Sequence, residues 1–222
     1  MRLYYYTSAD YAVDDFSNER IKISLLDAVN DPNEWVPSVE NTDLSAGAVR
    51  QKILENFNIE WGFISFSKSW NIAPMWGMYA DKYKGAVLEF DIDVDLVREV
   101  EYAPVRVVCK DNIANNFDAE DFERLIRRKS CDWSYEKEVR HIVQLFPRNC
   151  DCIGSNYFAK IGIGRNSQQR LKLIAVRCGP LMLQQNYGRL KYLQRLKNDQ
   201  EFIPVIRTQF SKGKFDLEEV RQ

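Results

Sequence analysis

Short apolar segments of the strand type are spread over the whole chain, and they limit what it can fold into. They stand at residues 3–6, 21–24, 61–70, 85–93, 140–146, 171–180 and 202–210. Segments with apolar residues at helical spacing lie between them, at residues 43–57, 73–85, 118–130 and 184–199. The two kinds do not alternate in the regular order that a doubly wound parallel sheet requires. We therefore expect an α+β fold.

The charge balance and the lack of long apolar runs narrow the class of protein. The 222 residues include 31 Lys or Arg and 32 Asp or Glu, a formal net charge of −1, which argues against a surface dedicated to nucleic acid. The opening MRLYYYTSADYAVDD lacks the apolar region of a secretory signal, and no apolar run reaches transmembrane length. We expect one domain over residues 1–222, located in the cytoplasm and without a membrane partner.

The histidine and cysteine contents exclude several kinds of catalytic site. His141 is the single histidine, which rules out multi-histidine metal sites and two-histidine nuclease mechanisms. The five cysteines have irregular spacing, which predicts reduced thiols and neither a disulfide framework nor a zinc site. The chain contains no Walker A sequence and no complete dinucleotide-binding glycine motif. We expect no metal.

The stretch WSYEKEVRHI at residues 133–142 contains acidic residues, which strands usually lack. If this stretch is a strand, Glu136, Glu138 and Arg140 share one face, because strand side chains alternate with period two. One interpretation is a solvated sheet edge with cross-strand ion pairs. The other is the acidic end of an active site. His141 would face the other way, as an ordinary sheet histidine.

Three signatures follow one another along the chain: NDPNE at residues 30–34, MWGMYADKYKG at 75–85 and WSYEKEVR at 133–140. In these the sequence resembles a widespread bacterial family classed as domain of unknown function 2971. More distantly it is similar to the ADP-ribosyltransferase superfamily, whose Arg-Ser-Glu branch has an opening strand, an aromatic-x-Ser-x-Ser strand and a Glu-x-Glu strand. LYYYTS, FISFS and EKE stand in those places. The resemblance implies a split, mainly antiparallel sheet flanked by helices.

The resemblance also implies a site that cleaves NAD as a co-substrate without metal. Glu138 would stabilise the oxocarbenium-like ribose, and Glu136 would orient or deprotonate the nucleophile. The implied NAD-binding residues are Tyr5, Tyr6, Thr7, Ser65, Ser67, Trp76 and Tyr79, with Asn30, Asp31, Glu34 and Arg140 as supporting residues. Taken alone, Trp76 and Tyr79 are three residues apart on a helix, which is more typical of core packing. The first-strand Arg or His of that branch is replaced by Tyr5, so a basic residue from elsewhere is needed, or the site is inactive.

The function expected from this resemblance is an NAD-dependent ADP-ribosyltransferase, or an NAD glycohydrolase if water is the acceptor. It would act as a bacterial toxin or phage-defence effector on RNA, DNA or protein, with an antitoxin or sensor as a partner. The alternative is a catalytically inactive domain of such a system that binds a nucleotide or a partner protein. Arg127, Arg128 and Lys129, with the basic helix at 184–199, would frame a groove for a polynucleotide acceptor. An ordinary amphipathic surface helix is the simpler interpretation of 184–199.

Overall fold

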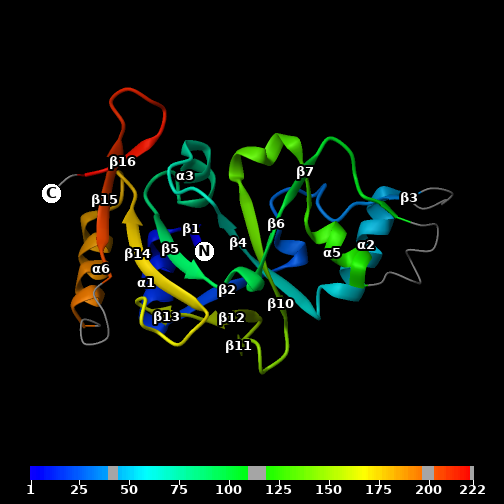
Figure 1. Ribbon diagram of the computed structural model, residues 1–222, viewed down its shortest axis with the longest axis horizontal. Helices are drawn as coiled ribbons and strands as arrows, with labels where there is room; N and C mark the ends of the chain where they lie inside the picture. Colours follow the sequence, from blue (N-terminus) through cyan, green and yellow to red (C-terminus); the bar gives the residue numbers. More distant parts are fainter. Residues whose placement is uncertain (40–44, 110–118, 197–202, 221–222) are drawn as a thin grey trace.

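The computed structural model describes residues 1–39, 45–109, 119–196 and 203–220. Its large sheet is built from β1 (Arg2–Thr7), β2 (Arg20–Leu25), β4 (Trp61–Ser67), β5 (Ala86–Ile92), β6 (Val97–Glu99), β10 (Glu138–Gln144), β11 (Asp151–Ile153), β12 (Asn156–Lys160), β13 (Gly162–Ile163), β14 (Leu171–Cys178), β15 (Val205–Phe210) and β16 (Leu217–Glu219). The strand order is β11-β12-β2-β4-β1-β5-β14-β15-β16 (Figure 1). Only β13–β14 and β14–β15 pair in parallel within it. The expected α+β class with a mainly antiparallel sheet is confirmed.

The sheet divides at β4. One edge of β4 pairs with β10 along its whole length, from Ser67 opposite Glu138 to Trp61 opposite Gln144. The other edge is shared, because β2 pairs near its start and β1 pairs only at Ser67, opposite Tyr4. The first strand therefore leaves β4 soon after their contact. A cleft opens between the two strands.

Two short parallel pairs lie beside the large sheet. They are β3 (Ser38–Val39) with β8 (Val108–Cys109), and β7 (Glu101–Ala103) with β9 (Arg128–Ser130). The pair β7–β9 carries Lys129 next to the start of β10, since the backbone N–H of Glu138 donates to the hydroxyl of Tyr102 on β7 at 2.7 Å. This pairing positions one of the basic residues of the site.

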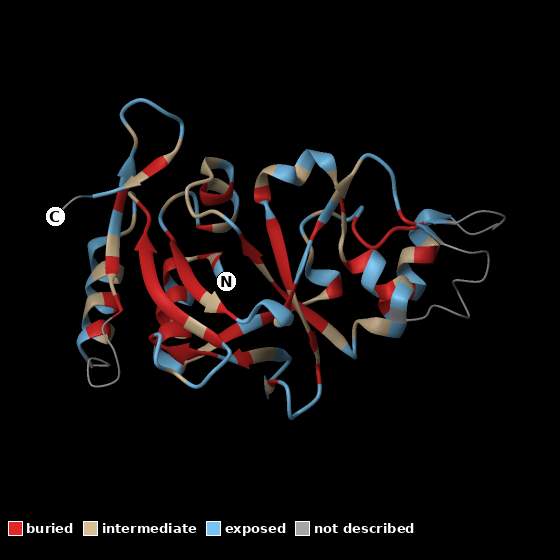
Figure 2. Cartoon of the chain, in the orientation of Figure 1, coloured by how far each residue is buried: buried red, intermediate tan, exposed pale blue. Residues whose placement is uncertain are grey.

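The α-helices within the described residues lie at the two ends of the sheet, except for a short one that packs against β1 nearer the middle (Figure 1). They are α1 (Ala9–Asn18), α2 (Ala46–Phe57), α3 (Ala73–Tyr79), α5 (Ala119–Ile126) and α6 (Gln184–Leu196). In α1 the apolar residues follow helical spacing, Ser8 caps the first turn, and α1 and α6 pack together on the core at one end (Figure 1). α2 and α5 share a second apolar cluster at the other end. The buried residues concentrate on the central strands (Figure 2).

Three expected elements differ from the structure, and one of them is the helix expected over 73–85, which ends at Tyr79. Residues 131–136 form a 3₁₀ helix, η3 (Cys131–Glu136), capped by the Ser130 side chain, and the strand begins only at Glu138. Lys137 between them adopts a left-handed conformation with φ of 48°, which turns the chain sharply. The helix expected over 118–130 ends at Ile126, because the next residues pair with β7. The prediction that Glu136 lies on the same strand as Glu138 is therefore wrong.

No helix within the described ranges has both the length and the apolar character needed to cross a membrane.

Candidate functional site

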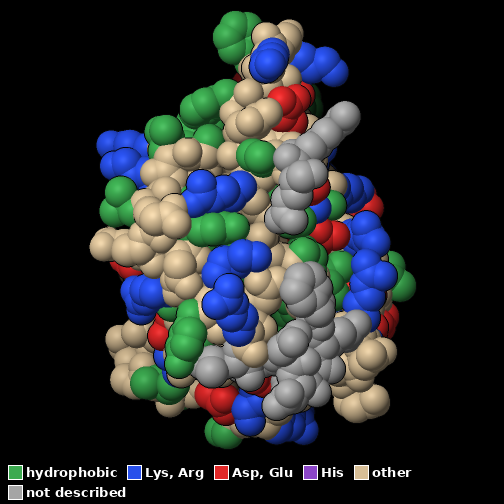
Figure 3. All heavy atoms as spheres, turned by 90° about the vertical axis from the view of Figure 1, so that its left-hand side faces the viewer, with side chains coloured by type: hydrophobic (Ala, Val, Ile, Leu, Met, Phe, Trp, Pro, Cys, Tyr) green, Lys and Arg blue, Asp and Glu red, His purple; other side chains and the backbone are tan. Residues whose placement is uncertain are grey.

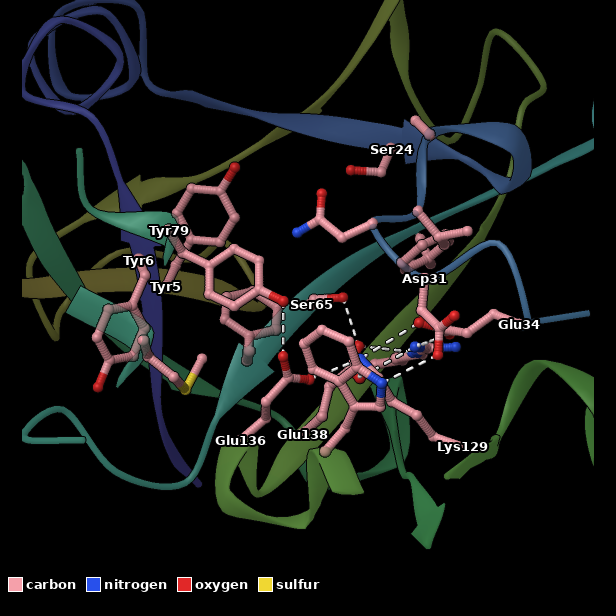
Figure 4. A pocket seen from close by; sticks show the side chains of 18 residues that line it. Tyr5, Tyr6, Ser24, Asp31, Glu34, Ser65, Tyr79, Lys129, Glu136 and Glu138 are labelled. Atoms are coloured by element: carbon pink, nitrogen blue, oxygen red, sulfur yellow. Dashed lines mark hydrogen bonds and ion pairs between the residues drawn. The ribbon is translucent and has the colours of Figure 1, made fainter. Parts of the chain in front are cut away.

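A cleft of about 260 Å³ lies where β1 and β4 separate (Figure 4). Its walls come from strands, from the loop after β2 and from η3. The lining residues are Tyr5, Tyr6, Ser24, Ala28, Val29, Asn30, Asp31, Glu34, Phe63, Ser65, Phe66, Met75, Tyr79, Lys129, Trp133, Glu136, Glu138 and Arg140. Tyrosines gather on one side and charged side chains on the other (Figure 4). An aromatic wall facing a polar wall suits a ligand with both a ring and a sugar.

Glu138 is the most completely bonded carboxylate of the cleft. Its Oε1 accepts hydrogen bonds from Ser65 Oγ and from Arg140 Nε, both at 2.6 Å. Its Oε2 accepts from Lys129 Nζ at 3.1 Å and from Arg140 Nη2 at 3.0 Å. The side chain is only 5% exposed. Four donors therefore fix the position of this carboxylate at the base of the cleft.

Glu136 reaches the same cleft from η3. Tyr79 donates its hydroxyl to Oε1 of Glu136 at 2.6 Å, and Lys129 donates to Oε2 at 2.6 Å. The left-handed turn at Lys137 brings both glutamates to one lysine, although only Glu138 belongs to the strand.

Glu34, Lys129 and Arg140 complete a buried charge network. Arg140 is 1% exposed and donates from Nη2 to Glu34 at 2.6 Å and from Nη1 to the backbone carbonyl of Ile126 at 2.6 Å. Lys129 lies 3.3 Å from the Glu34 carboxylate as well. Three carboxylates thus surround two cations, and with all five groups charged the network carries a net −1 (+2 − 3).

The network shifts the pKa values of Glu136 and Glu138 in opposite directions. Burial favours the neutral acid of Glu138, but Arg140 and Lys129 outweigh burial and lower its pKa to about 2. For Glu136 burial prevails over Lys129 and raises the pKa. Burial and the nearby Glu136 carboxylate raise the pKa of Tyr79. Glu138 is therefore a fixed anion, whereas Glu136 is the acid that takes up a proton more readily.

The structure brings most of the expected site residues together. Tyr5, Tyr6, Ser65, Tyr79, Asn30, Asp31, Glu34 and Arg140 line the cleft with the two glutamates. The interpretation of Glu136, Glu138 and Arg140 as a solvated sheet edge is wrong, because all three are buried in the network.

Three expected NAD-binding residues lie outside the cleft lining. Trp76 is fully buried, donates its indole N–H to the carbonyl of Trp70 and packs edge-on against Tyr6, so it is a core residue. Ser67 is fully buried and donates to the backbone carbonyl of Glu136 at 2.6 Å. Thr7 is buried opposite Ala86 at the end of β1. These three support the cleft from behind.

Lys129 is a cleft residue that the sequence analysis assigns to a different role. It was grouped with Arg127 and Arg128 as part of a polynucleotide groove, but it is buried and points at the acids. The basic run RRKS does not show which of its residues faces inward. Only the pairing of β9 with β7 turns Lys129 toward the acids.

The prediction of a polynucleotide groove between the two basic segments is also wrong. α5, next to Arg127 and Arg128, lies at one end of the molecule, and α6 lies at the other (Figure 1). Basic side chains are prominent on the α6 face (Figure 3), which lies opposite the α5 end. The two sets therefore do not frame one groove.

The expectation for His141 is confirmed. His141 is half-buried on the face opposite Glu138, and its Nδ1 lies 2.8 Å from the carbonyl of Leu96, as an ordinary sheet histidine. Cys131, Cys150, Cys152 and Cys178 are free thiols. Within the described residues no group of three or more His, Cys, Asp or Glu side chains could hold a metal ion.

Comparisons with protein-family models, with curated proteins and with solved structures give no significant match for this chain. The geometry of the cleft therefore carries the functional argument.

Proposed function

We propose that this protein is an ADP-ribosyltransferase that uses NAD as its co-substrate, with an ADP-ribosyltransferase-like fold. The observation that carries the proposal is the hydrogen bond of 2.6 Å from Ser65 to the buried Glu138 at the base of a cleft between diverging strands. This is the pair that the resemblance to the Arg-Ser-Glu branch implies. The resemblance to the bacterial family of unknown function remains part of the same proposal.

The reaction needs an anion at a defined place. Cleavage of the bond between the ribose C1′ and the nicotinamide nitrogen sends the bonding electron pair to the nicotinamide ring, and positive charge develops on the ribose. A carboxylate held by four donors stabilises that charge as it appears and needs no rearrangement at that moment. Glu138 meets this need, because its low pKa keeps it ionised at neutral pH. One of its oxygens would also accept the ribose 2′-hydroxyl in place of one of the four donors.

The acceptor would be activated by the second acid. Its O–H or N–H proton passes to Glu136 as its oxygen or nitrogen bonds to C1′, and the raised pKa of Glu136 favours that transfer. Tyr5 and Tyr79 lie on the opposite wall, where a nicotinamide ring would stack. With water as the acceptor the same site is an NAD glycohydrolase.

The direct test is nicotinamide release from NAD by the purified protein, alone and with RNA, DNA or cell lysate as acceptor. We expect Glu138→Gln to lower the rate about 10²–10³-fold, the range for loss of one preorganised electrostatic group. The variant should fold, since the network has one carboxylate in excess and the amide leaves two acids facing two cations. Ser65→Ala should also reduce the rate, with a smaller effect.

Glu89→Gln is the matched control. Glu89 is a buried glutamate on β5 that pairs with Arg177, and it does not line the cleft. It should therefore leave nicotinamide release unchanged. Equal loss of activity in both variants would show that the effect is on folding and would contradict the role given to Glu138.

A second candidate function is a catalytically inactive domain that binds a nucleotide or a partner protein. It is favoured by the four donors on Glu138, which leave no unused acceptor position in this state, and by Tyr5 at the place of the basic residue. NAD or ADP-ribose binding without nicotinamide release under any acceptor condition would support this candidate.

A role as a cytoplasmic bacterial toxin or phage-defence effector with an antitoxin or sensor partner belongs to the same proposal. It predicts growth arrest on expression that Glu138→Gln relieves. Growth arrest by both proteins alike would separate toxicity from NAD chemistry.

A further inference from the structure

A second cavity of about 310 Å³ adjoins the cleft. Its walls come from the loop after β2, from the stretch after β7, and from β9 and the start of η3. It shares four lining residues with the cleft: Asp31, Glu34, Lys129 and Trp133. These four residues form a wall, and the two cavities lie on its two sides.

The centre of this wall is a hydrogen bond between two side chains. Trp133 donates its indole N–H to Asp31 at 2.9 Å, and Lys129 Nζ lies 5.1 Å from the centre of the Trp133 ring. The cleft alone is smaller than the range of about 300–1,000 Å³ usual for small-molecule sites. A dinucleotide with one half in the cleft therefore has to place its other half beyond the cleft.

The cations of the cleft are not available to a phosphate. Lys129 contacts three carboxylates, and Arg140 directs its donors to Glu34, Glu138 and a carbonyl. The network around them has an excess of negative charge, which repels an incoming anion. Phosphate groups need cations from another part of the site.

The second cavity has two arginines whose positive charge or donor groups are not fully paired with neighbouring residues. Arg106 donates to the carbonyl of Val36 at 3.2 Å and to the amide oxygen of Asn33 at 3.0 Å, and both of these acceptors are uncharged. The Nε of Arg128 is buried and has no hydrogen-bond partner among the described residues. Its Nη2 lies 3.4 Å from Glu101, a long contact. A guanidinium with a donor that lacks a partner gains from an added acceptor, and Arg128 lines a cavity that can admit one.

The carboxylates of this cavity are already occupied. Asp31 accepts from Trp133 and from the backbone and side chain of Asn33. Asp132 accepts from the hydroxyl of Ser130 at 3.1 Å. Guanidinium groups recognise phosphate oxygens through paired charged hydrogen bonds, which suits the two arginines to this ligand.

We infer that the second cavity is the phosphate-binding subsite of the dinucleotide, with Arg106 and Arg128 contacting the phosphate oxygens across the wall from Glu138. This inference rests on the proposed function for the identity of the ligand. It supplies the basic residues that the first strand lacks at Tyr5.

The test is calorimetric titration of the full chain with ADP-ribose, and separately with inorganic pyrophosphate. We expect Arg128→Gln and Arg106→Gln each to weaken ADP-ribose binding about ten- to hundredfold, the effect of one charged hydrogen bond. Arg170→Gln is the matched control: Arg170 is exposed, paired with Asp93 and Asp95, and outside both cavities, so binding should be unchanged. Thermal unfolding checks that each variant is folded.

Kinetics with two substrates separate the subsite from the chemistry. Arg128→Gln should raise KM for NAD and leave kcat within about twofold. Hydrolysis of nicotinamide riboside, which has no phosphates, should not change. If no nicotinamide is released but ADP-ribose binding still depends on Arg128, the proposed chemistry fails and the subsite stands. ADP-ribose binding that is absent, weaker than that of pyrophosphate alone, or equal in wild type and Arg128→Gln would overturn the inference.

Discussion

At the scale of single residues, the cleft depends on a lysine and an arginine that hold three acids. Buried charges are tolerated only when they are paired and hydrogen-bonded, and here the five groups satisfy one another. The pairing keeps Glu138 ionised where NAD chemistry would need an anion. The stability of the fold and the chemistry of the cleft therefore rest on the same contacts.

Lys129→Met should strongly destabilise the protein. The methionine keeps most of the apolar stem but leaves three buried carboxylates with Arg140 alone. We expect the free energy of unfolding at pH 7 to fall by about 3–5 kcal/mol, the usual cost of breaking a buried pair. Urea denaturation measures this. Lys160→Met removes a lysine that is 67% exposed and should change the value by less than about 0.5 kcal/mol. Similar values for both variants would mean that the network does not hold the fold.

Glu138 should make stability depend on acid pH. Its pKa is about 2 in the folded state, below the unfolded value near 4.3, so its contribution is present above about pH 5 and is lost as the pH falls toward 2. The stability of wild type relative to Glu138→Gln should fall by about 1 kcal/mol between pH 6 and pH 3.5. Urea denaturation at the two pH values gives this difference.

Glu136 should change the stability with pH in the opposite direction to Glu138. Burial raises its pKa above the unfolded value, so the folded state binds more protons and wild type should gain stability relative to Glu136→Gln as the pH falls from 6. If both glutamates gave the same sign, the opposite pKa shifts assigned to them would be refuted.

At the scale of secondary-structure elements, tight connections place the two walls of the cleft. η3 and the left-handed Lys137 direct both glutamates inward, and α3 carries Tyr79 to meet them. After α3 the chain runs through three left-handed residues, 81–83, into Gly85 at the start of β5. The end of β1 lies against this turn. The position of Tyr79 therefore depends on close backbone approach at Gly85.

Gly85→Ala tests that dependence. An added Cβ would lie 2.2 Å from the carbonyl oxygen of Thr7 and 2.8 Å from the backbone of Ala80, so the backbone has to move. We expect a loss of about 1–3 kcal/mol in the free energy of unfolding, as for other overpacked sites. Gly47→Ala, in α2 with open space around it, should be neutral or stabilising by about 0.5–1 kcal/mol. Thermal unfolding of the two variants provides the comparison, and a stable Gly85→Ala protein would refute the tight turn.

At the scale of the whole molecule, the cleft exists because β4 pairs with three strands, and two of them share one of its edges. It pairs fully with β10 and only in part with β2 and β1, so a space remains between β1 and β4. Apolar clusters at both ends of the sheet hold the strands in this arrangement. The second cavity lies next to the same opening, which gives an extended ligand two adjacent places to bind.

Local residue patterns were enough to predict much of the secondary structure and part of the site. Period-two and helical spacings identified seven strands of the large sheet and the positions of α2, α3, α5 and α6, because these patterns report which face of an element is buried. The short strands and α1 were not predicted. The resemblance to the ADP-ribosyltransferase superfamily also brought Ser65, Glu138 and Tyr79 into one hypothesis, and they do lie in one cleft. These features depend on neighbouring residues or on short motifs.

Long-range packing determines which of those side chains face the cleft. Lys129 and Arg140 join Glu34 and Glu138 across as many as 106 positions of sequence, and no local pattern specifies such pairs. Trp76, Ser67 and Thr7 were assigned to the ligand by motif, but packing turned them into the core. Strand pairing sets these long-range contacts, since a shift of one residue exchanges the two faces of a strand.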